Sequence, residues 1–413
     1  MMHLLDIASK FNRNRIENLL QKSLPYFLFL VFITTTAGAA SGYLDHNAWK
    51  MGDWLINYQG GIIRRGLLGE VIYQLSYFSN INPGFYVIVL QVFFYGIFFY
   101  FSYLLLKKQL ILLPYALLIF SPFIFTFQIN DLQGGFRKEI IYFAVLAFIV
   151  WSASVKDRKT FEKIFYIILL LYPVIILSHE MFAIFLPYLL VVYFSISILT
   201  KKSFFLISIL LLPSILSFLM ATHYSGTSNQ VVEIFNSIAG EDYSIAGGAI
   251  SWLDKDTSFG VQQVVDKIKN DHYFGYIFIA LFTIFAYIPI YEKLKLIAKN
   301  KFSLLLILVS MIGSIGLFIV AIDWGRFIYI HLVSIFLLSL ISTQKINNYK
   351  EDACKHSVNP LIVIFFIIYT LLWHIPHCGS PSSAYKQINI IEFTRPYKEI
   401  SFFIYTNSKQ ILQ

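Results

Sequence analysis

The sequence predicts an all-helical, polytopic membrane protein with about eleven spans. Its 413 residues are 57% hydrophobic and only 13% charged, whereas soluble domains carry about 25% charged residues. Several apolar runs reach the roughly 20 residues that a helix needs to cross a bilayer. The alternating pattern of a membrane β-barrel is absent, so helices are expected throughout.

The first third of the chain leads from a polar start into the bundle. Residues 1–24 are polar and basic and are expected in the cytoplasm. The first span is expected at 25–42, and it is retained rather than cleaved because the polar region before it is too long for a signal peptide. The first loop, 43–82, is expected to carry an amphipathic helix over 62–79 that lies in the membrane interface.

The transmembrane bundle is expected to occupy residues 25–376. After the first span, its predicted spans are 83–106, 109–127, 140–155, two within 164–199, 203–222, 276–291, two within 303–343, and 359–376. Residues 223–275 form a large polar loop with helices expected near 228–238 and 257–269, and residues 377–413 form a polar tail.

The basic turns predict the orientation of the chain. Basic residues gather at 1–24, 107–108, 156–163, 201–202, 292–301 and 344–357. These turns alternate with the other loops, and cytoplasmic loops are enriched in Lys and Arg. The N-terminus is therefore expected inside, and the C-terminus and the loops 43–82 and 223–275 outside. In a bacterial inner membrane, the outside is the periplasm.

Composition also limits the cofactors and partners. The net charge of +9 is accounted for by the cytoplasmic turns, so no nucleic acid is expected. The two cysteines, Cys354 and Cys378, fall on opposite faces in this topology, so no disulfide is expected. The sequence has no metal-ligand spacing, and we expect no metal and no cofactor.

Several basic residues are predicted at the outer face, where the orientation rule does not favour them. They are Arg64 and Arg65, which follow Gly60 and Gly61, together with Arg137, Lys138 and Arg326. One interpretation is that they reach toward lipid headgroups. The other is an anion site, because arginine binds phosphate through two parallel hydrogen bonds and glycines let the backbone approach an anion.

Ionisable and aromatic residues lie in the same outer segments. His179 and Glu180 interrupt a long apolar run and form either a polar turn or a catalytic pair, in which burial would raise the pKa of the carboxyl and suit it to act as a base. Asp323 lies one helical turn from Arg326, so the two form a local ion pair or part of a site. The remaining candidates are Asp45 and Asp53 in the first loop and Trp324 as a sugar-stacking residue.

This layout resembles the bacterial O-antigen and capsule polymerases of the Wzy type. The resemblance extends over the whole chain in its architecture of membrane spans and one large outer loop. The local segments that show it are residues 60–66 and 323–326. It implies a glycosyltransferase that polymerises undecaprenyl-diphosphate-linked oligosaccharide repeats. Donor and acceptor glycans and the bilayer are the implied partners, with a chain-length regulator as a further candidate. Functional arginines carry over as Arg64, Arg65, Arg137 and Arg326.

Related activities remain open. A C-type membrane glycosyltransferase is similar in having an acidic residue just after the first span, here Asp45 or Asp53. An O-antigen ligase is a further neighbour. A flippase for the same lipids belongs to another class and predicts charges at mid-membrane and an internal repeat. A structural membrane partner would leave the outward arginines unexplained.

Overall fold

The computed structural model describes residues 13–109, 112–197, 200–240, 243–341, 360–379 and 389–411. Within these ranges the chain forms helices and turns and no strand, so the prediction of an all-helical fold is confirmed there. The expected turn at 344–357 with Cys354, the first 12 residues and residues 380–388 of the tail lie outside the described residues.

The first half of the chain forms long helices separated by short ones. In chain order they are α2 (Arg13–Leu44), α3 (Ala48–Leu55), α4 (Gly66–Ser79), α5 (Pro83–Lys107), the 3-10 helix η1 (Leu113–Tyr115), α6 (Ala116–Ile119), α7 (Phe127–Asn130), α8 (Leu132–Gly135), α9 (Glu139–Val155), α10 (Arg158–Ser178) and α11 (Phe182–Ile196). The hairpin expected within 164–199 is α10 and α11, and it turns at His179 and Glu180 as predicted.

The second half repeats this alternation of long and short helices. It contains α12 (Lys201–His223), α13 (Ser228–Ile238), η2 (Ile250–Trp252), α14 (Thr257–Lys269), α15 (Tyr273–Tyr287), η3 (Ile288–Ile290), α16 (Tyr291–Ala298), α17 (Lys301–Val320), α18 (Trp324–Ser339), α20 (Pro360–Leu371) and α21 (Asn389–Ile411). The bounds of α13 and α14 are those expected for the large polar loop.

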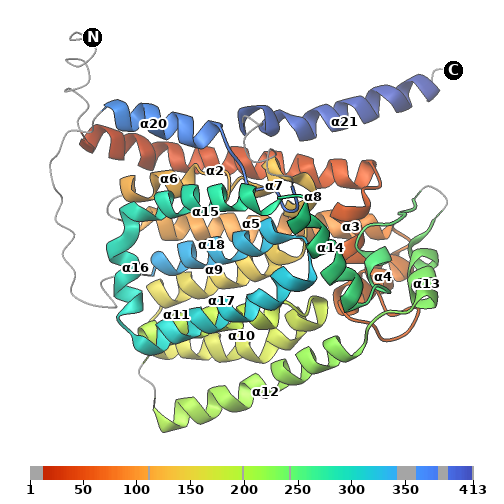
Figure 1. The fold of residues 1–413 in the computed structure, drawn as a ribbon, viewed down its shortest axis with the longest axis horizontal. Coiled ribbons are helices and arrows are strands. Elements are labelled where there is room, and N and C mark those ends of the chain that lie inside the picture. The colour runs from red at the N-terminus through yellow and green to blue at the C-terminus, as the bar shows by residue number, and fades with distance from the viewer. Residues whose placement is uncertain are drawn as a thin grey trace.

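Six helices are long and apolar enough to cross a membrane: α2, α5, α10, α12, α15 with its continuation through α16, and α17. Apart from α16, which runs across the others at the left of the view, their axes lie roughly along one direction (Figure 1). Both α12 and α17 expose large apolar side chains such as Leu212, Leu216 and Ile312, which a bilayer would cover. The fold is thus that of a helical membrane bundle, while the total number of spans and their orientation stay a prediction.

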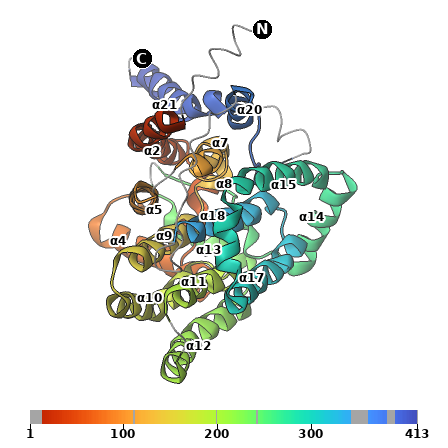
Figure 2. The same ribbon diagram turned by 90° about the vertical axis from the view of Figure 1, so that its left-hand side faces the viewer.

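Three shorter apolar helices, α9, α11 and α18, fill the middle of the bundle. They lie near the centre of the end-on view (Figure 2). Their side chains are buried almost without interruption; Phe143, Tyr188 and Phe336 are fully enclosed. Each of these helices is shorter than the roughly 20 residues of a full span, and each begins beside a polar turn.

The polar turns gather at one end of the bundle, which we call the polar end and define by α3, α4, α13 and α14. These helices lie at the right of Figure 1, opposite α16. Gly69 shows how closely this end packs, because a Cβ atom there would lie 1.9 Å from the carbonyl oxygen of Ile56. The helix expected at 62–79 begins at Gly66 rather than 62, since Arg65 adopts a left-handed conformation that a helix cannot include.

The continuous span expected at 109–127 is wrong. Its place is taken by η1, α6, α7 and α8, which are short helices separated by turns. Pro114 and Pro122 interrupt the helical hydrogen bonds in this stretch. Residues 121–132 are fully buried, and irregular backbone is tolerated in a membrane protein only where protein or water surrounds it.

Two more expectations need correction at the chain ends. The first span is longer than 25–42, because α2 begins at Arg13 and includes part of the expected polar segment. The tail is not a free polar segment, because α21 lies along α2 (Figure 2). The carboxylate of Glu399 accepts a hydrogen bond from Ser41 at 2.9 Å and pairs with Lys50 at 3.4 Å.

Candidate functional site

A cluster of charged side chains occupies the core of the polar end. Each comes from a turn or a helix terminus: α3, the loop before α4, the α8–α9 turn, the α10–α11 turn and the start of α18. Its basic members are Arg64, Arg65, Arg137, Lys138 and Arg326, and its acidic members are Asp53, Glu139, Glu180 and Asp323. We call this set the charged cluster.

Asp53 lies at the centre of the cluster. Asn47 caps α3 by accepting hydrogen bonds from two backbone N–H groups at 3.0 Å, and Trp54 anchors the helix by donating to the carbonyl of Phe136 at 2.8 Å. Asp53 is 1% exposed, and its Oδ1 has no hydrogen-bond partner in the described residues. Burial raises its pKa, but the nearby positive charges, of which Lys138 is the strongest, together outweigh burial and hold the pKa well below the usual range.

Lys138 joins three segments that are distant in sequence. Its ammonium donates to the carbonyl of Arg65 at 3.0 Å and to that of Ser178 at 2.9 Å, and its backbone N–H lies 3.5 Å from Asp53 Oδ2. The segment that contains Arg64 and Arg65 and the segment that contains Arg137 and Lys138 therefore meet in space. Burial lowers the pKa of Lys138 to about 8, because the apolar surroundings disfavour the ammonium form.

Arg65 and Glu180 form a bidentate ion pair. The guanidinium Nε donates to the carboxylate oxygens at 2.9 and 3.0 Å, and Nη2 donates to Oε1 at 2.6 Å. The expectation of a raised pKa for Glu180 is wrong: burial raises it, but the charge and hydrogen bonds of Arg65, together with other nearby positive charges, outweigh burial and lower the pKa well below its usual range. The neighbouring His179 is neutral, because burial and Arg65 lower its pKa to about 3.

Arg326 binds two carboxylates at once. It donates to Asp323 Oδ2 at 2.5 Å, so the local pair expected from the sequence is present, and it donates from Nε to Glu139 at 2.8 Å. Arg326 and Glu139 are both about 5% exposed. Removing one member would leave a buried charge unpaired, which costs about 3–5 kcal/mol.

Arg137 and Arg64 differ from Arg65 and Arg326, because neither pairs with a carboxylate in the part of the chain that is described. Arg137 is 4% exposed. Its Nε donates to the carbonyl of Gln133 at 3.2 Å, and its guanidinium lies 4.8 Å from the ring centre of Trp49. Arg64 donates to the carbonyl of Trp252 at 3.3 Å, and its buried Nε has no partner.

Four of the predicted site residues lie apart from the cluster. Asp45 is exposed, and its surroundings are Lys50 and Glu399 rather than the cluster. Gly60 and Gly61 pack against Gln230 of α13, and a Cβ on Gly60 would lie 2.8 Å from the Cα of that residue. Trp324 is 8% exposed and donates to the carbonyl of Phe318 at 3.1 Å, so its ring is enclosed by protein.

Sequence reasoning missed three residues of this region. Glu139 follows Lys138 directly but is not among the residues that the sequence singled out; its partner Arg326 is 187 residues away. Asp131 and His377 hydrogen-bond at 2.6 Å over a separation of 246 residues. A carboxylate beside an apolar helix start was the one available signal for Glu139, since buried carboxylates require partners.

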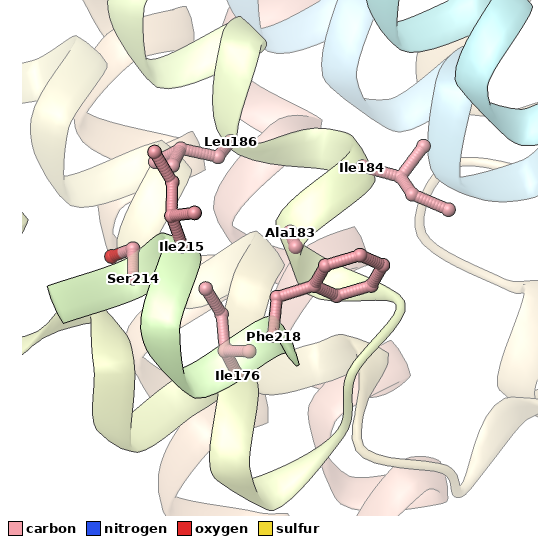
Figure 3. A pocket seen from close by; sticks show the side chains of 7 residues that line it. All are labelled: Ile176, Ala183, Ile184, Leu186, Ser214, Ile215 and Phe218. Carbon is pink, nitrogen blue, oxygen red and sulfur yellow. The ribbon is translucent and has the colours of Figure 1, made fainter. Parts of the chain in front are cut away.

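An apolar pocket of about 250 Å³ lies between α10, α11 and α12, next to the turn that carries Glu180. Side chains of the three helices face one another across it (Figure 3). Ile176 comes from α10, Ala183 and Leu186 come from α11, and Ser214 and Phe218 come from α12. The pocket therefore offers an apolar cavity within a few residues of the charged cluster.

The charged cluster provides guanidinium groups for an anion and a buried, ionised carboxylate beside them. Comparisons with protein-family models, with curated proteins and with solved structures found no match to this chain.

Proposed function

We propose that this protein is an integral-membrane glycosyltransferase that takes its sugar from a polyprenyl-phosphate carrier at the polar end. The observation that carries this proposal is the contrast among the arginines. Arg65 and Arg326 are matched by carboxylates, whereas Arg64 and Arg137 are not. Arg137 is buried, as is the Nε of Arg64, and a guanidinium withdrawn from water without an ion-pair partner is costly. A substrate phosphate would supply that partner through bidentate hydrogen bonds.

The same arginines suit the chemistry of sugar transfer. When the bond between the sugar and its carrier phosphate breaks, negative charge develops on the leaving phosphate. Preorganised cations in a site that excludes water stabilise that charge more than water does. Arg137, with Trp49 against its face, and Arg64 are the groups proposed for this role.

Asp53 is the group proposed to accept the proton of the attacking sugar hydroxyl. It is buried, ionised and has one unpaired oxygen. Its low pKa in the free protein makes it a weak base. Binding of an anionic phosphate would offset the charge of Lys138 that lowers this pKa, and would move Asp53 toward the range in which general bases work best.

The apolar pocket is proposed to hold part of the polyprenyl chain. It follows the charged cluster along α10 and α11, since Ile176 and Ala183 flank Glu180 in the sequence. A lipid-linked sugar has the matching arrangement, with an apolar tail joined to a phosphate. The pocket is too small for a whole polyprenyl chain, so it would enclose the isoprene units next to the phosphate.

Two activities are candidates within this class, and different residues of the cluster favour each of them. A C-type transferase is favoured by the position of Asp53, which follows the first span and lies at the centre of the cluster. Polymerisation of undecaprenyl-diphosphate-linked repeats, the activity implied by the Wzy resemblance, is the second candidate. It is favoured by two unmatched guanidinium groups, Arg64 and Arg137, which suffice for the two phosphates of a diphosphate.

The buried charged side chains of the described residues gather at the polar end rather than along the bundle, which favours an enzyme over a flippase. The alternation of basic turns supports a bacterial inner membrane with the polar end facing the periplasm. Donor and acceptor glycans are then the partners, and neither a nucleotide nor nucleic acid is needed.

The proposal is tested with the purified full-length protein in lipid nanodiscs. Polyprenyl-diphosphate and polyprenyl-monophosphate sugars are offered as donors with a glycan acceptor. Transfer from a lipid donor is expected, and Asp53→Asn should reduce it about 10²–10⁴-fold, whereas the matched change Asp45→Asn should not. Repeated addition would identify the polymerase, and addition of one sugar the C-type transferase. Equal activity of the two variants would remove Asp53 from the mechanism.

A further inference from the structure

Three potential metal ligands meet at the edge of the charged cluster. They are Asp323, in the turn between α17 and α18, and His377 and Cys378, in the segment after α20. One ligand atom from each residue lies within 4.8 Å of the other two. A carboxylate oxygen, an imidazole nitrogen and a thiol sulfur therefore converge from two segments that lie more than 50 residues apart in the sequence.

The histidine ring is held in place by a second carboxylate. Asp131 Oδ2 accepts hydrogen bonds from both the Nδ1 and the backbone N–H of His377, each at 2.6 Å. Its other oxygen accepts from the backbone N–H of Gly134 at 2.8 Å. With Nδ1 occupied, Nε2 is the nitrogen that remains for a metal. Histidines that bind metals almost always donate their other ring N–H in this way.

The backbone brings the two segments into contact. The N–H of Gly325 donates to the carbonyl of His377 at 3.0 Å, and the hydroxyl of Tyr276 donates to the carbonyl of Pro376 at 3.0 Å. Gly325 is required for this approach, since a Cβ atom there would lie 1.9 Å from the carbonyl oxygen of Pro376. The three ligands are thus placed by main-chain contacts.

We propose that Asp323, His377 and Cys378 bind a divalent transition metal of the zinc type. The combination of thiolate, imidazole and carboxylate is typical of zinc, and thiolate excludes magnesium and calcium. Asp323 can contact both Arg326 and the metal, because Arg326 hydrogen-bonds only its Oδ2. Three protein ligands leave a fourth tetrahedral position for water or for an oxygen of a bound phosphate.

The spacing of these residues could not reveal the site, and the sequence predicted no metal. His377 and Cys378 are adjacent, but Asp323 lies more than 50 residues away, whereas zinc motifs that are recognisable in sequence contain two pairs of closely spaced ligands. Binding would release the thiol proton and any proton on the imidazole, so metal affinity should fall as the pH falls.

The test measures metal content rather than activity. Wild-type protein is purified from cells grown with zinc and analysed by plasma mass spectrometry, with about one zinc per chain expected. Cys378→Ser should lose the metal. Cys354→Ser changes the other cysteine of the chain and is the matched control, which should keep it. Wild-type protein without zinc, or equal zinc in the two variants, would overturn the proposal.

Cobalt binding provides a second measurement, and its first part uses only the wild-type protein, so it does not depend on whether a variant folds. When zinc is removed by chelation and replaced by Co²⁺, the wild-type protein should show the near-ultraviolet absorption of a cobalt–thiolate bond. Asp131→Asn keeps all three ligands but removes the carboxylate that orients the ring, and it should weaken cobalt binding about 10–100-fold. Absence of the thiolate band in wild-type protein would exclude Cys378 as a ligand.

Discussion

Replacing Arg137 with glutamine separates a substrate-binding arginine from a structural one. In the folded chain Arg137 makes one side-chain hydrogen bond, to the carbonyl of Gln133, and a cation–π contact with Trp49. Each contributes about 0.5–1.5 kcal/mol. Their loss is offset by removal of a buried charge that has no carboxylate partner in the described residues, so the net change in stability should be about 1 kcal/mol or less.

The effect on the donor should be larger. A hydrogen bond from a guanidinium to a charged group contributes about 1.5–3 kcal/mol, which corresponds to a loss of about 10–150-fold in donor affinity. The assay compares thermal denaturation in detergent with equilibrium binding of a polyprenyl-diphosphate sugar.

Arg326→Gln provides the contrast to this variant. It leaves Glu139 and Asp323 without their partner and should cost about 3–5 kcal/mol of stability. If Arg137→Gln unfolded the protein as readily as Arg326→Gln, or bound the donor as tightly as wild-type protein, the distinction between matched and unmatched arginines would be refuted.

Two further predictions concern Lys138 and the apolar pocket. Lys138 has a pKa of about 8 against an ordinary 10.5, so it loses its positive charge above pH 8 and donor affinity should fall there. Between these two pKa values the unfolded chain binds more protons than the folded chain, so the contribution of Lys138 to stability should rise with pH. A pH profile of donor binding that is unchanged in Lys138→Met would contradict this. Ala183→Trp should fill the pocket and weaken binding of a long-chain donor about tenfold, as expected for displacing two methylene groups. Leu212→Trp, on the exposed side of α12, should have no effect, and equal KM values for the two tryptophan variants would refute a role for the pocket.

Much of the fold follows from the sequence because apolar runs and polar turns follow each other clearly. Helices are expected near 228–238 and 257–269, and the observed bounds agree; in the structure each follows a capping residue, Thr227 or Asp256. The span expected at 109–127 failed because hydropathy alone does not distinguish a continuous helix from a buried chain that two prolines break.

The sequence allowed the basic residues of the site to be predicted, but not the carboxylate with which each one forms an ion pair. The positive-inside bias marked Arg65 and Lys138 as unusual at the outer face. It gave no information on which carboxylate each would contact. Arg326 pairs with Glu139 through the packing of α18 on α9, and Lys138 binds the carbonyl of Ser178 through the packing of three turns. Such contacts depend on tertiary structure, which the pattern of apolar and charged residues along the chain does not reveal.

The most direct test of the central claim is a comparison of two ligands that differ only in their phosphate groups. Binding of a short polyprenyl diphosphate and of the parent polyprenol to the wild-type protein in nanodiscs would be measured under the same conditions. If Arg64 and Arg137 bind phosphate, the diphosphate should bind roughly 100-fold more tightly or better, from two charge-assisted hydrogen bonds. Equal affinity for the diphosphate and the alcohol would contradict the proposed anion site.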